Sequence, residues 1–569
     1  MEDLDFQFTA PETGEYDCKL ERAENGVALY RVSMRREREA APEKAVLSFS
    51  VRGADAYSVF DCRRVDRAKS WGGVERTSRL AADLPLMQMI SKTGRNRYLF
   101  ALSDVKTPVS IRIRCDYTVM ASQVEISFFT ELAAPVKEYA CVLRVDMRDI
   151  PYETALSDAK AWYASLGYAP APVPAAAEAP LYSTWYSYLT RVTAADVLRE
   201  CEAAKALGMD TVIIDDGWQR ADGGSPYGQT GDWEPYPEKF PDMAGLVRRL
   251  HALGMKAMLW YAVPFMGKHA KNVSRFAGKY LREAPGCDCF VLDPRYPDVR
   301  AFIVETYTRA AKAWDLDGFK LDFIDRFRTN GEVREGMDFV SVEDAVECLL
   351  LEIRGALAAV RPDMLIEFRQ PYSGPVIGAF ANMLRAWDCP NDGMTNRVAV
   401  LNLRFTAGAA VHADPLRWRA DETPEAVAVM LYGTVFGVPQ ISVRLDTLSP
   451  AHRRVLARYL TFWRAHRETL LHGTLSAQSP EALFASAAAT LNGEKVVAAF
   501  AQNFIDVADT KKAFILNLTA SPELILRTAP GTRLQAFDCL GNRVYDRSAE
   551  TALTQIPVPV GGMATTGEE

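Results

Sequence analysis

The hydrophobic pattern divides the chain into three regions of different texture. From residue 1 to about 150, apolar and polar positions alternate in short runs with few helical stretches. Five of these runs predict strands of an antiparallel β-sandwich: 45–53, 98–104, 109–117, 123–132 and 139–147. A helix is expected at 153–167, and the Pro/Ala-rich stretch 169–180 is expected to be an extended linker.

In the middle region, short apolar runs alternate with amphipathic helices. Eight runs are candidate strands: 181–187, 210–216, 256–263, 318–325, 364–370, 383–388, 408–414 and 439–445. Helices are expected between them at 193–207, 241–254, 299–314 and 341–360, and Thr193 and Asp196 form a capping box for the first. Eight such βα units predict a (β/α)8 TIM barrel. A doubly wound sheet is the alternative, but no Gly-rich phosphate loop follows the first strand.

The alternating pattern returns after residue 470. Runs at 495–503, 512–520, 523–528 and 533–540 predict a smaller antiparallel β-domain, and the tail 561–569 is expected to be disordered. The predicted domains are therefore an N-terminal β-sandwich with a terminal helix (1–170), a catalytic barrel (171–470) and a C-terminal β-sandwich (471–569).

Composition narrows the range of functions. The 569 residues carry a net charge of −7, which argues against nucleic acid or an anionic membrane as the main partner. The six histidines are scattered, so carboxylates are the expected carriers of any acid–base chemistry. No apolar run approaches the ~18 residues of a membrane helix. The acidic N-terminus lacks the pattern of a signal peptide, so a cytoplasmic protein is expected. In that compartment the ten cysteines are expected to be free, buried thiols.

Carboxylates, cations and aromatic rings gather where the barrel strands are expected to end, which is the face on which TIM-barrel enzymes carry out chemistry. The candidate site residues are Trp185, Asp215, Asp216, Trp218, Trp260, Lys320, Asp322, Glu367, Arg369, Arg385, Asp388 and His412. Cleavage of a glycosidic bond needs two carboxyl groups, one ionised and one protonated, and sugar C–H faces pack on aromatic rings. Any one of these acids could equally cap a helix, Lys320 could form a structural salt bridge, and His412 could be a wall residue.

Five motifs carry a resemblance to a known group of enzymes. They are DTVIIDDGW (210–218), GDWEPYPEKFPDM (231–243), CFVLDPRYPDVR (289–300), DGFKLDFID (317–325) and RAWDCPNDGMTNR (385–397). In order and spacing they resemble the retaining α-galactosidases of glycoside hydrolase families 27 and 36, most closely family 36. The resemblance covers the barrel and matches the three-domain order of family 36.

The resemblance implies a role for each matching residue. Asp322 corresponds to the nucleophile and Asp388 to the general acid/base. Asp215 and Asp216 correspond to acceptors for the O4 and O6 hydroxyls, and Lys320 to a hydroxyl contact beside the nucleophile. The family needs neither a metal nor an organic cofactor, so none is expected here.

Other positions are less direct. Arg385 resembles an arginine that reaches toward O2. Glu367, Arg369 and Gln370 stand where the family has a Cys and a Gly-rich stretch that contacts the sugar. Asp392 is the alternative acid, because alignment backwards from the end of the last motif requires a gap. Trp185, Trp218 and Trp260 are candidate stacking rings, and His412 lies at the expected mouth.

The sequence therefore predicts a retaining exo-α-glycosidase, in the first place an α-galactosidase acting on a small carbohydrate, with no nucleic-acid or membrane partner and with homo-oligomerisation left open. An α-N-acetylgalactosaminidase or another α-hexosidase is an alternative of the same class. A non-catalytic sugar-binding barrel is a second alternative. A third is a metal-dependent lyase or isomerase that would use Asp215, Asp322 and Glu367 as ligands.

Overall fold

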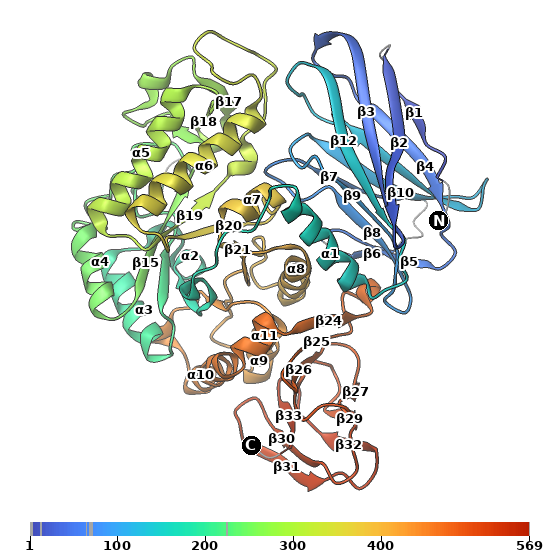
Figure 1. Cartoon of the computed structure of the whole chain (residues 1–569). Helices are drawn as coiled ribbons and strands as arrows, with labels where there is room; N and C mark the ends of the chain where they lie inside the picture. The colour runs from blue at the N-terminus through green and yellow to red at the C-terminus, as the bar shows by residue number, and fades with distance from the viewer. Residues whose placement is uncertain (1–3, 12–13, 64, 68–71, 224–225, 568–569) are drawn as a thin grey trace.

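The computed structural model describes residues 4–11, 14–63, 65–67, 72–223 and 226–567. Figure 1 shows an N-terminal β-sandwich in blue, a central barrel running from green to orange, and a C-terminal β-unit in orange-red, with the barrel contacting both. All ten cysteines lie in the described ranges and are free thiols. Among the helices described, none combines the length and the apolar character needed to cross a membrane.

The N-terminal region forms two facing antiparallel sheets. The first has the order β1 (Gln7–Thr9), β4 (Ala45–Val51), β11 (Ala121–Phe128), β10 (Val109–Asp116) and β7 (Val74–Ser78). The second has the order β2 (Glu15–Glu24), β3 (Val27–Ala40), β12 (Val136–Asp146), β9 (Asn96–Leu102), β8 (Leu86–Ser91), β5 (Ala56–Phe60) and β6 (Val65–Arg67). Alternate residues of both sheets form a buried apolar core, which confirms the predicted sandwich.

The central sheet is an eight-stranded parallel barrel, as predicted. Its strands are β13 (Leu181–Ser183), β14 (Thr211–Ile214), β15 (Lys256–Ala262), β19 (Gly318–Asp322), β20 (Leu365–Arg369), β21 (Met383–Arg385), β22 (Ala410–His412) and β23 (Gln440–Ile441). A parallel bridge between His412 and Val438 closes the ring. Each strand lies within one of the eight apolar runs, because a strand buried on both faces needs apolar residues at nearly every position.

Amphipathic helices surround the barrel (Figure 1). The α-helices of the described residues are α1 (Tyr152–Ser165), α2 (Trp185–Tyr188), α3 (Ala194–Ala206), α4 (Met243–Ala252), α5 (Pro297–Trp314), α6 (Val342–Val360), α7 (Pro375–Phe380), α8 (Gly393–Thr406), α9 (Pro424–Gly433), α10 (Pro450–Ala465) and α11 (Arg467–His472). The capping box expected at Thr193 and Asp196 is present at the start of α3.

Two features of the barrel region differ from the sequence expectations. After β15 the chain forms a small antiparallel sheet of β16 (Phe265–Gly267), β18 (Cys289–Leu292) and β17 (Tyr280–Ala284). The expected extended linker contains a 3-10 turn, η1 (Ala175–Glu178), whose Ala177 is fully buried against the first residues of the barrel strands. Three consecutive alanines allow this close approach, so the stretch closes the barrel at its lower end, where the strands begin.

The C-terminal region contains two sheets. The larger has the order β24 (Thr474–Gln478), β25 (Ser486–Leu491), β26 (Glu494–Ala499), β28 (Lys512–Asn517), β33 (Met563–Thr566), β30 (Arg533–Phe537) and β31 (Arg543–Ser548). The smaller has the order β27 (Phe504–Asp506), β29 (Glu523–Arg527) and β32 (Leu553–Pro557). Pairing is antiparallel except for β26–β28 and β27–β29. The expectation of a disordered tail is wrong for β33, which pairs between β28 and β30.

Candidate active site

The pleat of the barrel strands sorts the interior side chains into two layers. The lower layer is an apolar cluster that includes Leu181, Ile213, Met258, Leu365, Met383 and Ala410. Side chains alternate between the faces of a strand, so positions two residues further along also face the interior. Those positions hold Ser183, Asp215, Trp260, Glu367, Arg385 and His412. A polar layer therefore lies directly above an apolar floor.

Lys320 joins the polar layer from strand β19, where Gly318 occupies the lower level. Gly318 is in register with Met258 and Leu365 on the neighbouring strands. A Cβ atom at Gly318 would lie 2.5 Å from the carbonyl oxygen of Leu365, so no side chain fits at this level.

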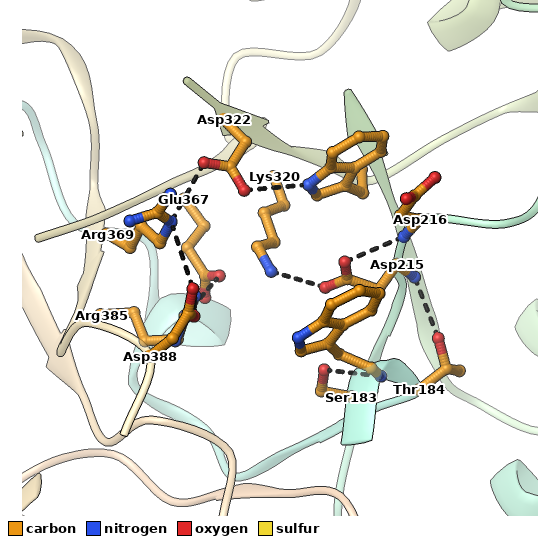
Figure 2. Close-up of polar contacts among 12 residues, drawn as sticks. Ser183, Thr184, Asp215, Asp216, Lys320, Asp322, Glu367, Arg369, Arg385 and Asp388 are labelled. Atoms are coloured by element: carbon orange, nitrogen blue, oxygen red, sulfur yellow. Dashed lines mark hydrogen bonds and ion pairs between the residues drawn. The ribbon is translucent and has the colours of Figure 1, made fainter. Parts of the chain in front are cut away.

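Asp215 and Lys320 form a buried ion pair across the barrel (Figure 2). Lys320 Nζ donates to Asp215 Oδ2 at 2.5 Å, and the two side chains are only 3% and 6% exposed. The backbone N–H of Asp215 donates to Thr184 Oγ1 at 3.0 Å, and the N–H of Asp216 donates to Asp215 Oδ1 at 2.9 Å. The lysine charge offsets the cost of burying the Asp215 carboxylate and fixes its orientation.

Asp216 is also buried but points away from Lys320 (Figure 2). Its Oδ1 accepts from Gln219 Nε2 at 2.8 Å. Burial raises the pKa of Asp216 to about 6, although Gln219 and Arg220 offset part of this effect. The chain turns at Gly217 with φ +119°, and a Cβ atom there would lie 2.4 Å from the carbonyl oxygen of Thr190, so the glycine of the DDGW motif is required for this turn.

Asp322 ends strand β19 and is held on both carboxylate oxygens. Oδ1 accepts from the backbone N–H of Phe323 at 2.8 Å, from Arg369 Nε at 3.0 Å and from the hydroxyl of Tyr372. Oδ2 accepts from Trp260 Nε1 at 3.1 Å. Burial raises the pKa of Asp322, but the charges of Arg369 and Lys320 more than compensate and hold that pKa below its ordinary value. Asp322 is therefore ionised at neutral pH.

Asp388 lies across the site from Asp322 and is far more accessible, with 47% of its side chain exposed. Its Oδ1 accepts from a terminal nitrogen of Arg385 at 2.8 Å. Burial of the carboxyl group is opposed by the charges of Arg385 and Arg369, and the net effect holds the pKa of Asp388 well below its usual range.

Arg369 stands between these two carboxylates (Figure 2). Its Nε lies 3.0 Å from Asp322 Oδ1 and 4.0 Å from Asp388 Oδ2. Its guanidinium also lies over the rings of Phe323 and Tyr372, at 5.7 and 5.1 Å from the ring centres. One cation therefore lies beside both acids, and Asp322 Oδ1 and Asp388 Oδ2 are at most about 7 Å apart.

Arg385 is buried among three carboxylates. Besides Asp388, it donates to Asp414 Oδ1, and its Nε lies 3.8 Å from Glu367 Oε1. Burial raises the pKa of Glu367, and Arg385 and Lys320 offset part of this rise. Burial likewise raises the pKa of Asp414 to about 6 despite Arg385. Arg385 is thus held by Asp414 and Glu367 while it also contacts Asp388.

Of the predicted aromatic contacts, the structure brings the Trp260 ring to the site, places the backbone of Trp185 directly after β13 and leaves the Trp218 ring outside the site. Trp260 is 2% exposed and donates to Asp322, so it orients the carboxylate. Trp185 is half-buried at the start of α2, directly after β13. Trp218 is fully buried, donates to the carbonyl oxygen of Trp260 and packs against Trp233, Tyr261 and Trp314. Its ring therefore belongs to the packing outside the barrel strands.

His412 faces the barrel interior but points toward the floor. Its Nε2 donates to the carbonyl oxygen of Ala177 at 2.7 Å, and burial lowers its pKa to about 4. His412 is therefore a neutral, fully buried residue that helps to close the barrel through its bond to η1. This position matches the wall-residue alternative.

Asp392, the alternative acid, is the N-cap of helix α8. Its Oδ1 accepts from the backbone N–H of Thr395 at 2.9 Å and its Oδ2 from the Thr395 hydroxyl at 2.6 Å. These bonds account for its position, whereas Asp388 lies beside Arg385 and Arg369.

Sequence reasoning missed Tyr372 and gave no role to Tyr186 or Asp414. Tyr372 lies three residues after Arg369 and returns to Asp322, and Tyr186 donates to Asp414 Oδ2 at 2.9 Å. The loop that carries Tyr372 back to Asp322 has no strand or helix periodicity in its sequence, so no pattern predicted this contact. Asp414 carried a usable signal, because it is two residues beyond His412 and so shares its strand face.

The N-terminal sandwich borders the site through Gln370. Gln370 Nε2 donates to the carbonyl oxygen of Cys62 at 3.1 Å, and its Oε1 accepts from the backbone N–H of Trp387 at 3.3 Å. Since Trp387 precedes Asp388, this amide links the sandwich to the segment that carries the candidate acid.

Within the described ranges, no group of three or more His, Cys, Asp or Glu side chains is arranged to hold a metal ion. The metal-enzyme alternative requires three carboxylate ligands that instead accept hydrogen bonds from other side chains. Asp215 accepts from Lys320, Asp322 from Trp260 and Glu367 from Gln440, among other partners.

Comparison with solved structures finds the same overall fold in family 36. The α-galactosidase of Lactobacillus brevis matches with a TM-score of 0.63 and 14% identity, over 100% of this chain and 86% of that one. The family-36 α-galactosidase AgaA of Geobacillus stearothermophilus, in complex with raffinose, matches with a TM-score of 0.64 and 15% identity, over 100% of this chain and 87% of that one.

Sequence similarity to curated proteins is local. An A type blood α-D-galactosamine galactosaminidase of Flavonifractor plautii is 27% identical over 146 residues, which cover 22% of this chain and 13% of that protein. α-Galactosidase 2 of Pediococcus pentosaceus is 28% identical over 146 residues, which cover 25% of this chain and 20% of that protein. No protein-family profile matches the chain. The resemblance predicted from the motifs is confirmed at the level of fold: the chain has the multidomain TIM-barrel architecture of the family-36 α-galactosidases.

Proposed function

We propose that the chain is a retaining exo-α-glycosidase that hydrolyses terminal α-galactosyl residues. The observation that carries the proposal is the arrangement of Asp322 and Asp388, an ionised buried acid and an exposed acid that lie on either side of Arg369. The bound of about 7 Å on their separation accommodates the ~5–5.5 Å expected for a retaining pair. The exo part of the proposal rests on the resemblance of the five motifs to the α-galactosidases.

In the first step, an Asp322 oxygen donates its electron pair to the anomeric carbon. The bond between that carbon and the glycosidic oxygen breaks, its electron pair stays on the leaving oxygen, and that oxygen takes a proton from Asp388. In the second step, Asp388 removes a proton from water, the water oxygen attacks the anomeric carbon, and Asp322 leaves as a carboxylate. Two inversions retain the α-configuration.

Asp388 has to gain a proton when substrate binds, because the first step uses it as an acid. In the free protein, Arg385 and Arg369 favour its ionised form. The contact with Arg369, at 4.0 Å, is longer than a hydrogen bond, and a bound sugar that covers Asp388 removes water from it, which raises the pKa of Asp388. Arg385 remains and holds the carboxyl group toward the leaving oxygen.

The galacto preference rests on the resemblance and on the strand-2 acids. Asp215 is preorganised by Lys320 to accept from a sugar hydroxyl, and Asp216 follows it at the same strand end. The similarity to the Flavonifractor plautii enzyme favours one second candidate, cleavage of α-galactosaminides.

A panel of p-nitrophenyl α-glycosides tests the proposal. The α-galactoside is expected to be cleaved best, and NMR of the first product is expected to show the α-anomer. Preferred cleavage of the α-galactosaminide would select the second candidate, and preferred cleavage of the N-acetylgalactosaminide would select the α-N-acetylgalactosaminidase alternative. A β-anomer as first product would refute retention, and no cleavage of any α-glycoside would favour a non-catalytic sugar-binding barrel.

A further inference from the structure

We propose that Tyr372 is a positioning residue that locks Oδ1 of Asp322, so that Oδ2 is the oxygen that attacks the anomeric carbon. The inference rests on the proposed function and deepens it by assigning the attacking atom and the residue that selects it.

The two oxygens of Asp322 have different surroundings. Oδ1 accepts from three donors, namely the Tyr372 hydroxyl, Arg369 Nε at 3.0 Å and the N–H of Phe323 at 2.8 Å. Among the described residues, Oδ2 accepts from Trp260 Nε1 alone, at 3.1 Å. A carboxylate oxygen has about two lone-pair sites, so Oδ1 is saturated while Oδ2 keeps electron density for a new bond.

The backbone after Asp322 contributes to this asymmetry. Phe323 adopts the left-handed conformation with φ +65°, which is unfavourable for a bulky residue. This turn directs the N–H of Phe323 back onto Asp322 Oδ1 and also within 3.3 Å of the Tyr372 hydroxyl oxygen. Local strain at this position therefore serves to fix one carboxylate oxygen.

Tyr372 is itself held firmly. Its side chain is fully buried, its ring packs edge-on against Phe368 at 5.5 Å between centres, and the guanidinium of Arg369 covers its face. Burial raises the pKa of the Tyr372 hydroxyl well above its ordinary value, so the phenol keeps its proton and remains a donor to Asp322.

This donor matters in both chemical steps. As Oδ2 bonds to the anomeric carbon and the aglycone leaves with the proton of Asp388, Asp322 becomes a neutral ester and Oδ1 becomes its carbonyl oxygen. When water then releases the sugar, the negative charge returns to Asp322. A hydrogen bond from Tyr372 to Oδ1 stabilises the carboxylate as a leaving group, so its loss should slow the second step more than the first.

Tyr372→Phe tests the role while keeping the buried ring. For p-nitrophenyl α-galactoside we expect kcat to fall about 10- to 100-fold, the range for loss of a hydrogen bond to a charged group, and KM to fall with it as the glycosyl enzyme accumulates. The acid limb of kcat/KM should move to higher pH, because Asp322 loses a donor to its ionised form. Tyr280→Phe is the matched control. The Tyr280 hydroxyl donates to the carbonyl oxygen of Val273 at 2.6 Å, and Tyr280 lies in β17, outside the barrel sheet.

A crystal structure of the wild-type enzyme trapped with an activated fluorosugar provides a second test. The ester is expected at Oδ2, with the Tyr372 hydroxyl still on Oδ1. An ester at Oδ1, or a Tyr372→Phe variant that cleaves galactosides with unaltered kcat and acid limb, would overturn the inference and leave the proposed function intact. A wild-type protein that cleaves no α-glycoside would overturn both, because there would be no nucleophile to position. Thermal unfolding of the variant separates a folding defect from the positioning effect.

Discussion

The lower and upper interior layers of the barrel come from the same strands, one pleat apart, and have opposite chemistry. Leu365 and Glu367 both lie in β20 and are 1% and 0% exposed, yet one belongs to an apolar floor and the other to a charged layer. Burial alone therefore does not separate the two layers. The difference is that each buried charge above the floor has a partner, as Lys320 has Asp215 and Arg385 has Asp414.

This comparison shows how one scaffold separates stability from chemistry. The floor gains its stability from the burial of apolar side chains, which is tolerant of small changes in position. The charged layer gains little net stability from its ion pairs but fixes the direction of each group, and losing one partner leaves an uncompensated charge. Substitutions in the floor should therefore change stability, and substitutions above it should change turnover.

The largest effect is expected for Asp322→Ala. Loss of the proposed nucleophile should lower kcat/KM by ~10⁴-fold or more, because the covalent intermediate of the proposed mechanism forms on Asp322. Azide should restore activity and give a β-galactosyl azide, detected by NMR. An α-azide product or unchanged activity would mean that Asp322 is not the nucleophile.

Asp388→Ala should separate substrates by their leaving group. Alkyl galactosides need protonation and should be cleaved ~10²- to 10⁴-fold more slowly, whereas the first step with activated phenols should be nearly spared. Pre-steady-state kinetics with dinitrophenyl and methyl α-galactosides measure the contrast. Equal losses for both substrates would remove Asp388 from the acid role.

In the floor, Leu365→Ala should cost ~2–5 kcal/mol of unfolding free energy, because it opens a cavity among packed side chains. Chemical denaturation measures this cost, and kcat at 25 °C should stay near the wild-type value. Leu351→Ala, at a position 61% exposed on α6, is the matched control and should change stability by less than ~0.5 kcal/mol. A large loss of kcat at full stability in Leu365→Ala would show that the two layers are not separable.

Arg369→Met should shift the pH profile. The guanidinium lowers the pKa of both Asp322 and Asp388, so its removal raises both values. The acid limb, where Asp322 must lose its proton, and the alkaline limb, where Asp388 must keep one, should both move to higher pH. Arg22→Met, at an arginine 70% exposed on β2, should leave both limbs in place. Movement of the limbs in opposite directions would contradict the shared role.

The smallest effect is expected for Asp392→Ala. Loss of the α8 N-cap should cost ~1 kcal/mol of stability and leave the leaving-group dependence unchanged. If Asp392→Ala instead shows the pattern expected for Asp388→Ala, then Asp392 is the acid and the assignment based on Arg385 and Arg369 is wrong.

The sequence predicted the barrel and much of its polar layer for a physical reason. Buried parallel strands require continuous apolar runs, so Lys320 and Asp322 within such a run had to face the interior or find partners, and they do both. Contacts that depend on irregular backbone were beyond this reasoning. Tyr372 returns through a loop, and η1 forms where the composition favoured an extended linker. Trp218 shows the converse limit, because position after a strand end does not fix which way an aromatic ring turns.

The turn η1 has a kinetic consequence. Ala177 is buried against the apolar floor and its carbonyl oxygen accepts from His412, so a substrate of the proposed reaction has to reach Asp322 and Asp388 from the opposite end of the barrel, where the strands end. In the proposed reaction the aglycone departs before water attacks the anomeric carbon, so the freed sugar leaves last. An enzyme that works by this mechanism releases its products in order, and its terminal sugar product competes with incoming substrate.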